Sequence, residues 1–136
     1  MDIRVIKIDP STRRITLKLG FDTISGLTKL VQIVVLSLLN VPGRDVLDPD
    51  AGAGLPDMIG MNIAADDTTE IFAEVALRVR KSQSEIISSQ IGLSVSQEEK
   101  LKEIQIVSID RGQEIDEIFV RLRIINELGR AAEVVM

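Results

Sequence analysis

The C-terminal part of the chain alternates apolar and polar side chains with the two-residue period of a β-strand. Residues 104–109 form one such stretch, and an Asp110-Arg111-Gly112 turn signal follows it. In the next stretch, Ile118, Val120, Leu122 and Ile124 alternate with Phe119, Arg121 and Arg123. A turn at 126–129 then precedes a last apolar segment, Arg130–Met136. This pattern predicts an antiparallel sheet whose final strand lies at an edge.

The N-terminal part shows the same period over shorter stretches. Ile3 and Val5 precede a Pro10-Ser11-Thr12 turn signal. On the far side of that turn, Ile15, Leu17 and Leu19 alternate with polar residues. The pattern predicts an N-terminal β-hairpin that ends at Gly20.

Helical spacing dominates the middle of the chain. After a cap at Asp22 or Thr23, apolar residues recur at Ile24, Leu27, Leu30, Val31, Val34, Val35 and Leu38. A second helix begins at Asp67 or Thr68 and ends at Gly92, with one stripe formed by Ile71, Val75, Val79, Ser82 and Ile86. Ser96-Gln97-Glu98-Glu99 has the form of a capping box, which predicts a short helix ending near Glu103.

Between the two main helices, residues 41–67 are rich in Pro and Gly and predict a long irregular loop. Strands and helices are therefore segregated along the chain, which is typical of α+β domains. We expect a single domain over 1–136, with an N-terminal hairpin, two main helices plus a short helix, and a C-terminal antiparallel sheet with an exposed edge strand. The first helix is apolar around most of its circumference, so other elements or a partner chain must cover it.

Composition excludes several classes of protein. The net charge of −5 disfavours nucleic-acid binding, which needs clustered cations. The apolar run Leu30–Leu39 is about half of the ~20 residues needed to cross a membrane, and residues 1–4 lack the apolar core of a signal peptide. We therefore expect neither a nucleic-acid partner nor a membrane partner.

The chain also lacks the residues on which much enzyme chemistry depends. It contains no His and no Cys, which excludes Ser-His-Asp and Cys-His nucleophiles and the usual zinc ligand sets. Glu98 with Asp110 or Glu114 could act as the carboxylate pair of a glycosidase. The three Phe are the only aromatic residues available to hold a sugar ring, so surface carboxylates are the favoured interpretation.

Other motifs have a structural interpretation that we prefer. The acidic residues Asp45, Asp48, Asp50, Asp57, Asp66 and Asp67 could bind calcium, but their spacing departs from the EF-hand loop and the closing Glu is missing. Gly52-Ala53-Gly54 is only a fragment of a phosphate-binding loop. Arg78, Arg80, Lys81, Arg121 and Arg123 are expected on solvated faces, with pairing to an acidic partner as the alternative. No catalytic residue, cofactor or metal is therefore expected.

The loop carries a more specific signal. Leu38-Leu39-Asn40-Val41-Pro42-Gly43-Arg44-Asp45, followed by Asp48-Pro49-Asp50-Ala51-Gly52-Ala53-Gly54-Leu55, resembles the signature of the baseplate wedge, or sheath initiator, family of contractile phage tails. That family also has a Glu-Pro-Arg-Ile motif before its C-terminal sheet, and Glu98-Glu99-Lys100-Leu101 is similar to it. Glu99 stands in place of Pro and Lys100 in place of Arg. Lys lacks the planar fork of Arg, so a carboxylate clamp at Lys100 is in doubt.

The resemblance implies an assembly role without catalysis, in the tail baseplate of a virion or tailocin made in the host cytoplasm. The implied partners are other baseplate wedge proteins, the tail sheath protein, and tail tube or hub proteins, in a six-fold assembly. The candidate interface residues are Pro42, Gly43, Arg44, Pro49, Gly52, Leu55, Glu98, Lys100, Leu101, Ala131, Ala132, Glu133, Val134, Val135 and Met136.

The last strand has two alternative environments. Its edge could accept strands from the first sheath ring, or it could be closed by the N-terminal hairpin. Two other functions also remain open: a small acidic peptidoglycan hydrolase, and a cytoplasmic adaptor that oligomerises through the Leu30–Leu39 helix.

Overall fold

The structure is a computed structural model, which describes residues 2–3, 6–8, 10–17, 23–43, 46–47, 49–55, 68–111 and 118–136. Its helices and strands, in chain order, are β1 (Asp2–Ile3), β2 (Ile6–Ile8), β3 (Ile15–Leu17), β4 (Thr23–Ile24), α1 (Gly26–Leu39), α2 (Thr68–Gln90), β5 (Leu101–Arg111), β6 (Ile118–Asn126) and β7 (Ala131–Val135).

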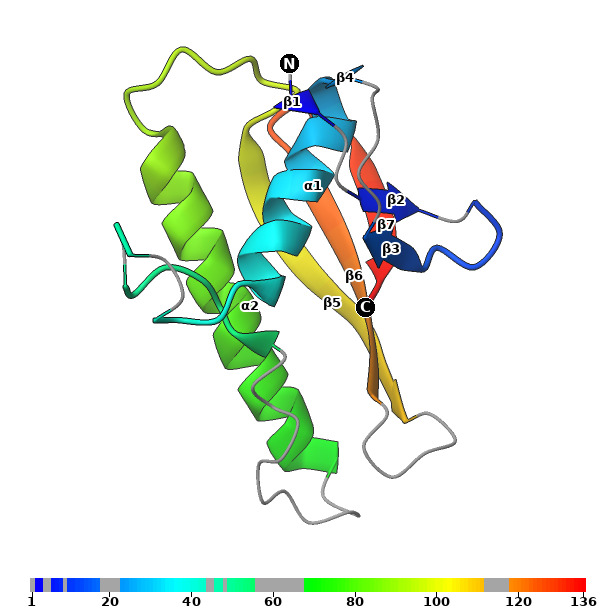
Figure 1. Cartoon of the computed structure of the whole chain (residues 1–136). Coiled ribbons are helices and arrows are strands. Elements are labelled where there is room, and N and C mark those ends of the chain that lie inside the picture. Colours follow the sequence, from blue (N-terminus) through cyan, green and yellow to red (C-terminus); the bar gives the residue numbers. More distant parts are fainter. Residues whose placement is uncertain are drawn as a thin grey trace.

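Two layers make up the main body of the fold (Figure 1). The strands β5, β6 and β7 form an antiparallel sheet in that order. Both helices lie on one face of this sheet, with α2 against β5 and α1 against β6 and β7. The α+β class predicted from the sequence is confirmed.

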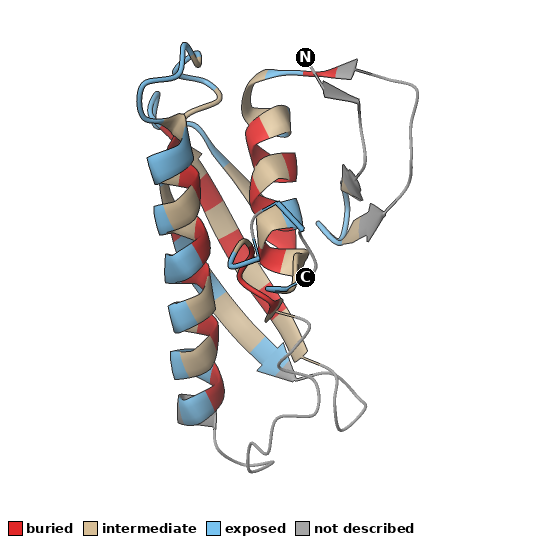
Figure 2. Cartoon of the chain, turned by 60° about the vertical axis from the view of Figure 1, so that its left-hand side comes forward, coloured by how far each residue is buried: buried red, intermediate tan, exposed pale blue. Residues whose placement is uncertain are grey.

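The predicted apolar stripes are the buried faces of their elements. All five residues of the second helical stripe are buried, namely Ile71, Val75, Val79, Ser82 and Ile86. Along β6 the burial alternates, and Val120, Leu122 and Ile124 point inward. Figure 2 shows the consequence for α2, which turns a buried face to the sheet and an exposed face to solvent.

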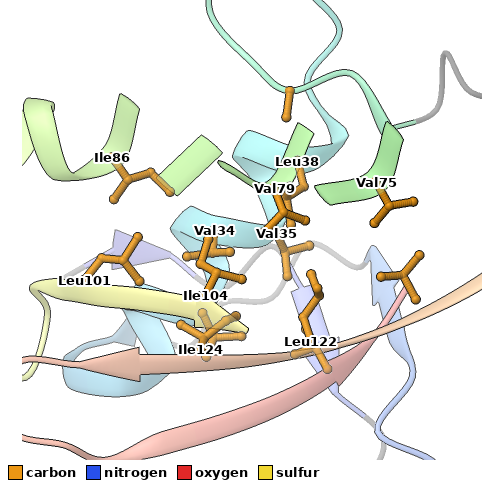
Figure 3. Close-up of a cluster of buried hydrophobic side chains, with 14 of the residues drawn as sticks. Val34, Val35, Leu38, Val75, Val79, Ile86, Leu101, Ile104, Leu122 and Ile124 are labelled. Atoms are coloured by element: carbon orange, nitrogen blue, oxygen red, sulfur yellow. The ribbon is translucent and has the colours of Figure 1, made fainter. Parts of the chain in front are cut away.

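The core between the layers is aliphatic. Val34, Val35 and Leu38 of α1 meet side chains from α2 and from the sheet, including Leu122 and Ile124 (Figure 3). None of the side chains in this buried cluster is aromatic. Branched aliphatic side chains from both helices and from all three strands of the sheet therefore fill the space between the layers.

The chain covers α1 with its own elements. Leu30, Val34, Val35 and Leu38 are fully buried between α2 and the sheet. Of the apolar α1 side chains, only Leu36 reaches the exposed class. The predicted apolar stripe is therefore correct, but α1 does not need a partner chain to cover it.

The helix also begins later than the sequence predicts. Thr23 and Ile24 form β4, and α1 starts at Gly26. Ser25 occupies the N-cap position, yet its side chain makes no capping hydrogen bond. The cap comes instead from Glu99, whose carboxylate accepts the Gly26 N–H.

No helix forms over 97–103. Turns occupy residues 97–99, and β5 begins at Leu101. The Ser96 carbonyl does accept N–H bonds from Glu99 and Lys100, which makes one local turn. The chain then enters the sheet, because Leu101 and Ile104 belong to the buried core. The capping-box prediction thus failed where core burial favours strand.

The N-terminal segment is more divided than the predicted hairpin. The strands β2 and β3 pair antiparallel, with Ile8 opposite Ile15, whereas β1 pairs with β4. Val5, Leu19 and Gly20, which were part of the hairpin prediction, lie outside the described residues.

The closely packed core generates a prediction for Leu122. This residue is fully buried, so Leu122→Ala should lower the free energy of unfolding by about 2 to 5 kcal/mol through lost burial and a residual cavity. Leu128 is 48% exposed, and Leu128→Ala should change it by less than about 0.5 kcal/mol. Urea denaturation of both variants measures the difference. Equal effects would contradict the packing described here.

Candidate interaction site

The loop after α1 folds back over the end of that helix. The Ala53 N–H donates to the Ser37 carbonyl at 3.0 Å, and the Gly54 N–H donates to the Asn40 carbonyl at 2.9 Å. The Asn40 side-chain amide donates to the Ala51 carbonyl at 3.2 Å. Carbonyls at a helix C-terminus have no partner within the helix, and the loop supplies two of the missing donors.

Charged side chains of α2 hold the same loop from the other side. Arg78 donates to the carbonyls of Ala53 and Gly54. Lys81 donates to the carbonyls of Asp50 (2.9 Å) and Gly52 (2.7 Å). Glu85 accepts the Gly52 N–H at 3.2 Å. We call Arg78, Lys81 and Glu85 the loop clamp.

Ion pairs hold the loop clamp in place along α2. Glu74 pairs with Arg78 at 2.9 Å, and Lys81 pairs with Glu85 at 3.5 Å, each with the four-residue spacing that brings side chains together on a helix. Deeper between the helices, the hydroxyl of buried Ser82 donates to the Ser37 hydroxyl at 2.8 Å. Residues 50–54 are therefore fixed to both helices, although their backbone is irregular.

An open groove of about 880 Å³ lies beside the fixed loop. Leu36 and Leu39 of α1 line it on one side, and Ser84 and Ser88 of α2 line it on the other. Earlier in the loop, Val46 and Leu47 are 92% and 96% exposed. The loop thus carries two exposed apolar side chains ahead of the segment that the loop clamp fixes.

A second set of contacts surrounds residues 98–101. The Asn126 side-chain amide donates to the Glu98 carbonyl at 3.1 Å, and Arg130 pairs with the Glu98 carboxylate at 3.4 Å. The Glu127 N–H donates to the Lys100 carbonyl at 3.1 Å. This segment therefore holds the turn between β6 and β7.

Glu99 connects the same segment to the start of α1. Its carboxylate accepts the Gly26 N–H at 3.1 Å and lies 3.3 Å from the Lys29 ammonium. The pKa of Glu99 lies below its ordinary value of 4.5, mainly because the carboxylate accepts the hydrogen bond from Gly26. Burial opposes this effect, and the charge of Lys29 lowers the pKa further. A carboxylate at a helix N-terminus also interacts favourably with the helix dipole.

The β7 edge presents backbone groups that β6 does not use. In an antiparallel pair, alternate residues direct their N–H and C=O groups toward the neighbouring strand. Met136 exchanges both bonds with Val120, so Ala131, Glu133 and Val135 face away from β6. The Val135 N–H donates to the Arg13 carbonyl at 2.9 Å, and Arg14 bridges to Val135. Neither predicted environment alone describes this edge, because among the described N-terminal residues the contacts with it are at Val135.

No hydrogen bond is found on the outward backbone groups of Ala131 and Glu133 within the described part of the chain. Around them lies a charged cluster on the sheet face opposite the helices. Glu133 pairs with Arg123 at 2.9 Å and with Arg121 at 3.6 Å. The Arg123 hydrogen bond is the main cause that lowers the pKa of Glu133. Arg14 lies over the Phe119 ring at 4.5 Å.

The structure separates the candidate interface residues by exposure. Pro42, Gly43, Pro49, Glu98 and Ala131 are exposed, and Leu55, Lys100, Ala132, Glu133 and Met136 are half-buried. Four of the candidates are buried inside the chain, namely the side chains of Leu101, Val134 and Val135 and the backbone of Gly52. A partner therefore cannot contact these groups directly. Arg44 lies outside the described residues. An interface role for the exposed set stays a prediction.

Sequence reasoning missed the residues that build this site. Lys81 is exposed as expected and Arg78 is half-buried, and both also bind the loop backbone, which the sequence did not indicate. These contacts join residues far apart in the sequence, so the apolar periodicity of α2 does not reveal them. The four-residue Glu74–Arg78 and Lys81–Glu85 pairs were the available signal, since they place these charges along one side of the helix.

The carboxylate pair considered for glycoside hydrolysis is separated. Glu98 precedes β5, and Asp110 is near its far end. The nine residue-to-residue steps from Leu101 to Asp110 span roughly 30 Å at ~3.3 Å each. A glycosidase pair needs a separation of ~5 to 10 Å. Glu114, the other candidate partner, lies outside the described residues.

The acidic residues of the calcium hypothesis fall largely outside the described ranges. Asp45, Asp48, Asp57, Asp66 and Asp67 of the calcium hypothesis lie outside the described residues. Within the described ranges, no three carboxylate, His or Cys side chains come together as a metal site would require. No helix in those ranges is long and apolar enough to span a membrane.

Comparison of this chain with protein-family models, with curated proteins and with solved structures found no match. The geometry of the loop, the 98–101 segment and the β7 edge is therefore the physical basis for a functional proposal.

The loop geometry predicts a specific intolerance at Gly52. Its φ is +101°, and a Cβ built there would lie 2.3 Å from the Asn40 carbonyl oxygen. Gly52→Ala should therefore cost more than the ~1 to 2 kcal/mol of left-handed backbone strain alone. Gly43→Ala is the matched control, because its φ is +95° and nothing lies within 4 Å of the added Cβ. Urea unfolding of both variants separates clash from strain, and equal losses would argue against the close loop–helix contact.

Glu99 predicts a pH dependence of stability. Its pKa is lowered in the folded state, so its contribution is present above the ordinary value of 4.5 and is lost as the pH falls through the folded pKa. Glu99→Gln should lower the free energy of unfolding at neutral pH, and the difference from wild type should shrink toward zero in acid. Urea titrations of the wild type and of Glu99→Gln, from neutral pH down through the folded pKa of Glu99, measure this difference. A difference that does not change with pH would show that the carboxylate does not cap α1.

Proposed function

We propose that this chain is a structural subunit of a contractile-tail baseplate, where it joins the baseplate wedge to the sheath and starts sheath assembly. Its partners are other wedge proteins, the sheath protein, and tail tube or hub proteins, in multiple copies around a six-fold axis. The mechanism is protein association without catalysis. The single observation that carries the proposal is the β7 edge with its outward backbone groups at Ala131 and Glu133.

Strand addition to this edge would give the connection that a sheath initiator requires. Main-chain hydrogen bonds supply affinity and direction with little dependence on the partner's sequence. An edge strand with free backbone groups otherwise invites aggregation, and an added partner strand would satisfy those groups. The β7 strand is held firmly in the domain, because Val134 is fully buried and β6 pairs with β7 along the length of β7.

The loop provides a second contact region. It carries most of the resemblance to the wedge family, and the loop clamp holds residues 50–54 against both helices. Exposed Pro42, Gly43 and Pro49 lie on the same loop, as do the apolar side chains of Val46 and Leu47. Residues 50–54, held in this way, lose little conformational entropy on binding, which favours a stable assembly contact.

The alternative functions have less structural support. The adaptor hypothesis uses the Leu30–Leu39 helix as an oligomer interface, but that stripe is buried inside the chain. The hydrolase hypothesis needs Glu98 and Asp110 close together, but the length of β5 separates them. Neither alternative gains a site from the described residues.

Ala131→Pro tests the β7 edge directly. Proline removes the outward N–H of residue 131 and is tolerated at sheet edges, so the domain should stay folded. Particles assembled with this variant should carry baseplates and tubes, and sheath should be absent or short by electron microscopy. Deletion of Arg130–Met136 is a poorer test, because it removes buried Val134 and exposes the core.

Ala131→Ser is the matched control for this experiment. Serine keeps the backbone N–H and changes the exposed side chain only slightly. Particles with Ala131→Ser should therefore have full-length sheaths. Full sheaths on Ala131→Pro particles would rule out strand addition at this edge, and absence of both variants from tail particles would rule out the baseplate assignment itself.

A further inference from the structure

At the β5 edge of the sheet, opposite β7, side chains of α2 accept hydrogen bonds from the outward backbone groups. Among the described strands, β5 pairs with β6 alone, so its other side is a second sheet edge. Gln83 accepts the Ile104 N–H at 2.8 Å, and Gln90 accepts the Leu101 N–H at 2.9 Å. The Gln90 side-chain amide also donates to the Glu99 carbonyl at 2.8 Å. Both glutamines come from α2, which lies against this strand (Figure 1).

The spacing of the two glutamines matches the strand. Gln83 and Gln90 are seven residues apart, which is ~10.5 Å along one face of an α-helix. Leu101 and Ile104 are three residues apart, about 10 Å along a strand, and the register shift between Leu101 and Glu103 allows both to direct their N–H groups outward. One helix face can therefore place an amide group opposite each of these two outward N–H groups. The two side chains do what the backbone of a neighbouring strand would do.

A bulge takes over where the glutamines end. The pairing of β5 with β6 shifts register between Ile106 and Ser108, which leaves Val107 unmatched and 43% exposed. Bulges twist and interrupt an edge, and proteins use them to prevent strand pairing. Beyond the bulge the strand continues for only a few residues, to Arg111.

We infer that Gln83 and Gln90 close the part of the β5 edge from Leu101 to Ile104 to polypeptide strands. A strand that adds to this sheet is therefore directed to β7. The closure belongs to the chain itself, whereas the identity of the incoming strand rests on the proposed function. A sheet with both edges open would join copies of itself through β5. The glutamines remove that route at the cost of two long side chains ordered on α2.

Amide hydrogen exchange tests the closure in the wild-type protein. Ile104 and Ile109 both direct their N–H groups away from β6, because their partners Ile124 and Val120 use theirs toward β7. Gln83 covers only Ile104. The Ile104 amide should exchange several-fold more slowly than the Ile109 amide. Equal exchange would overturn the inference without the need for any variant.

Substitutions of Gln83 test the effect on association. The chain contains no Cys, so a single Gln105→Cys reports on β5 pairing through a short thiol crosslinker. On this background Gln83→Leu removes the acceptor, and Gln83→Glu keeps an acceptor oxygen. Crosslinked dimers should rise several-fold with Gln83→Leu and stay at the wild-type level with Gln83→Glu.

The outcomes separate this inference from the proposed function. Folded Gln83→Leu protein with no increase in dimers, confirmed folded by circular dichroism, would overturn closure of β5 and leave the β7 proposal standing. Dimers that increase equally with Gln83→Glu would also overturn it, since the acceptor would then not matter. Sheath loss with Ala131→Pro concerns β7 alone and does not depend on either result.

Discussion

The fold depends on hydrogen bonds that satisfy the backbone groups at the ends of its helices and strands, made by side chains and backbone of the segments that pack there. Glu99 caps the start of α1 across 73 positions of sequence, and the 51–54 loop covers the carbonyls at its end. Buried Asn126 accepts the N–H groups of Leu128 and Arg130 and so shapes the turn before β7. Unsatisfied backbone groups are costly when buried, which explains why these contacts converge on a few polar residues.

These contacts also tie the proposed interaction regions to one another. The 98–101 segment touches the start of α1 through Glu99 and the β6–β7 turn through Glu98. The end of α1 in turn holds the loop, whose other support is the loop clamp on α2. A partner bound at the loop and a strand bound at β7 would therefore act on one connected framework of helices and sheet.

The sequence predicted the parts of the fold that follow from local periodicity. The stripe of α2 and the alternation of β6 are such patterns, and both match the buried faces. The short helix after Ser96 failed because a capping box is a local signal, whereas burial of Leu101 and Ile104 is decided by tertiary packing. The loop clamp was missed for the same reason, since its bonds join α2 to residues more than twenty positions away.

The two edges of the sheet show how a protein with an aliphatic core could select a partner through its backbone. Affinity from apolar surface has little direction, whereas backbone hydrogen bonds fix the direction of an added strand. Specificity then requires that only one edge be available. Gln83 and Gln90 occupy backbone groups on β5, while Ala131 and Glu133 keep theirs on β7. The chemistry that selects a partner in this chain would therefore lie in which backbone groups its own side chains leave open.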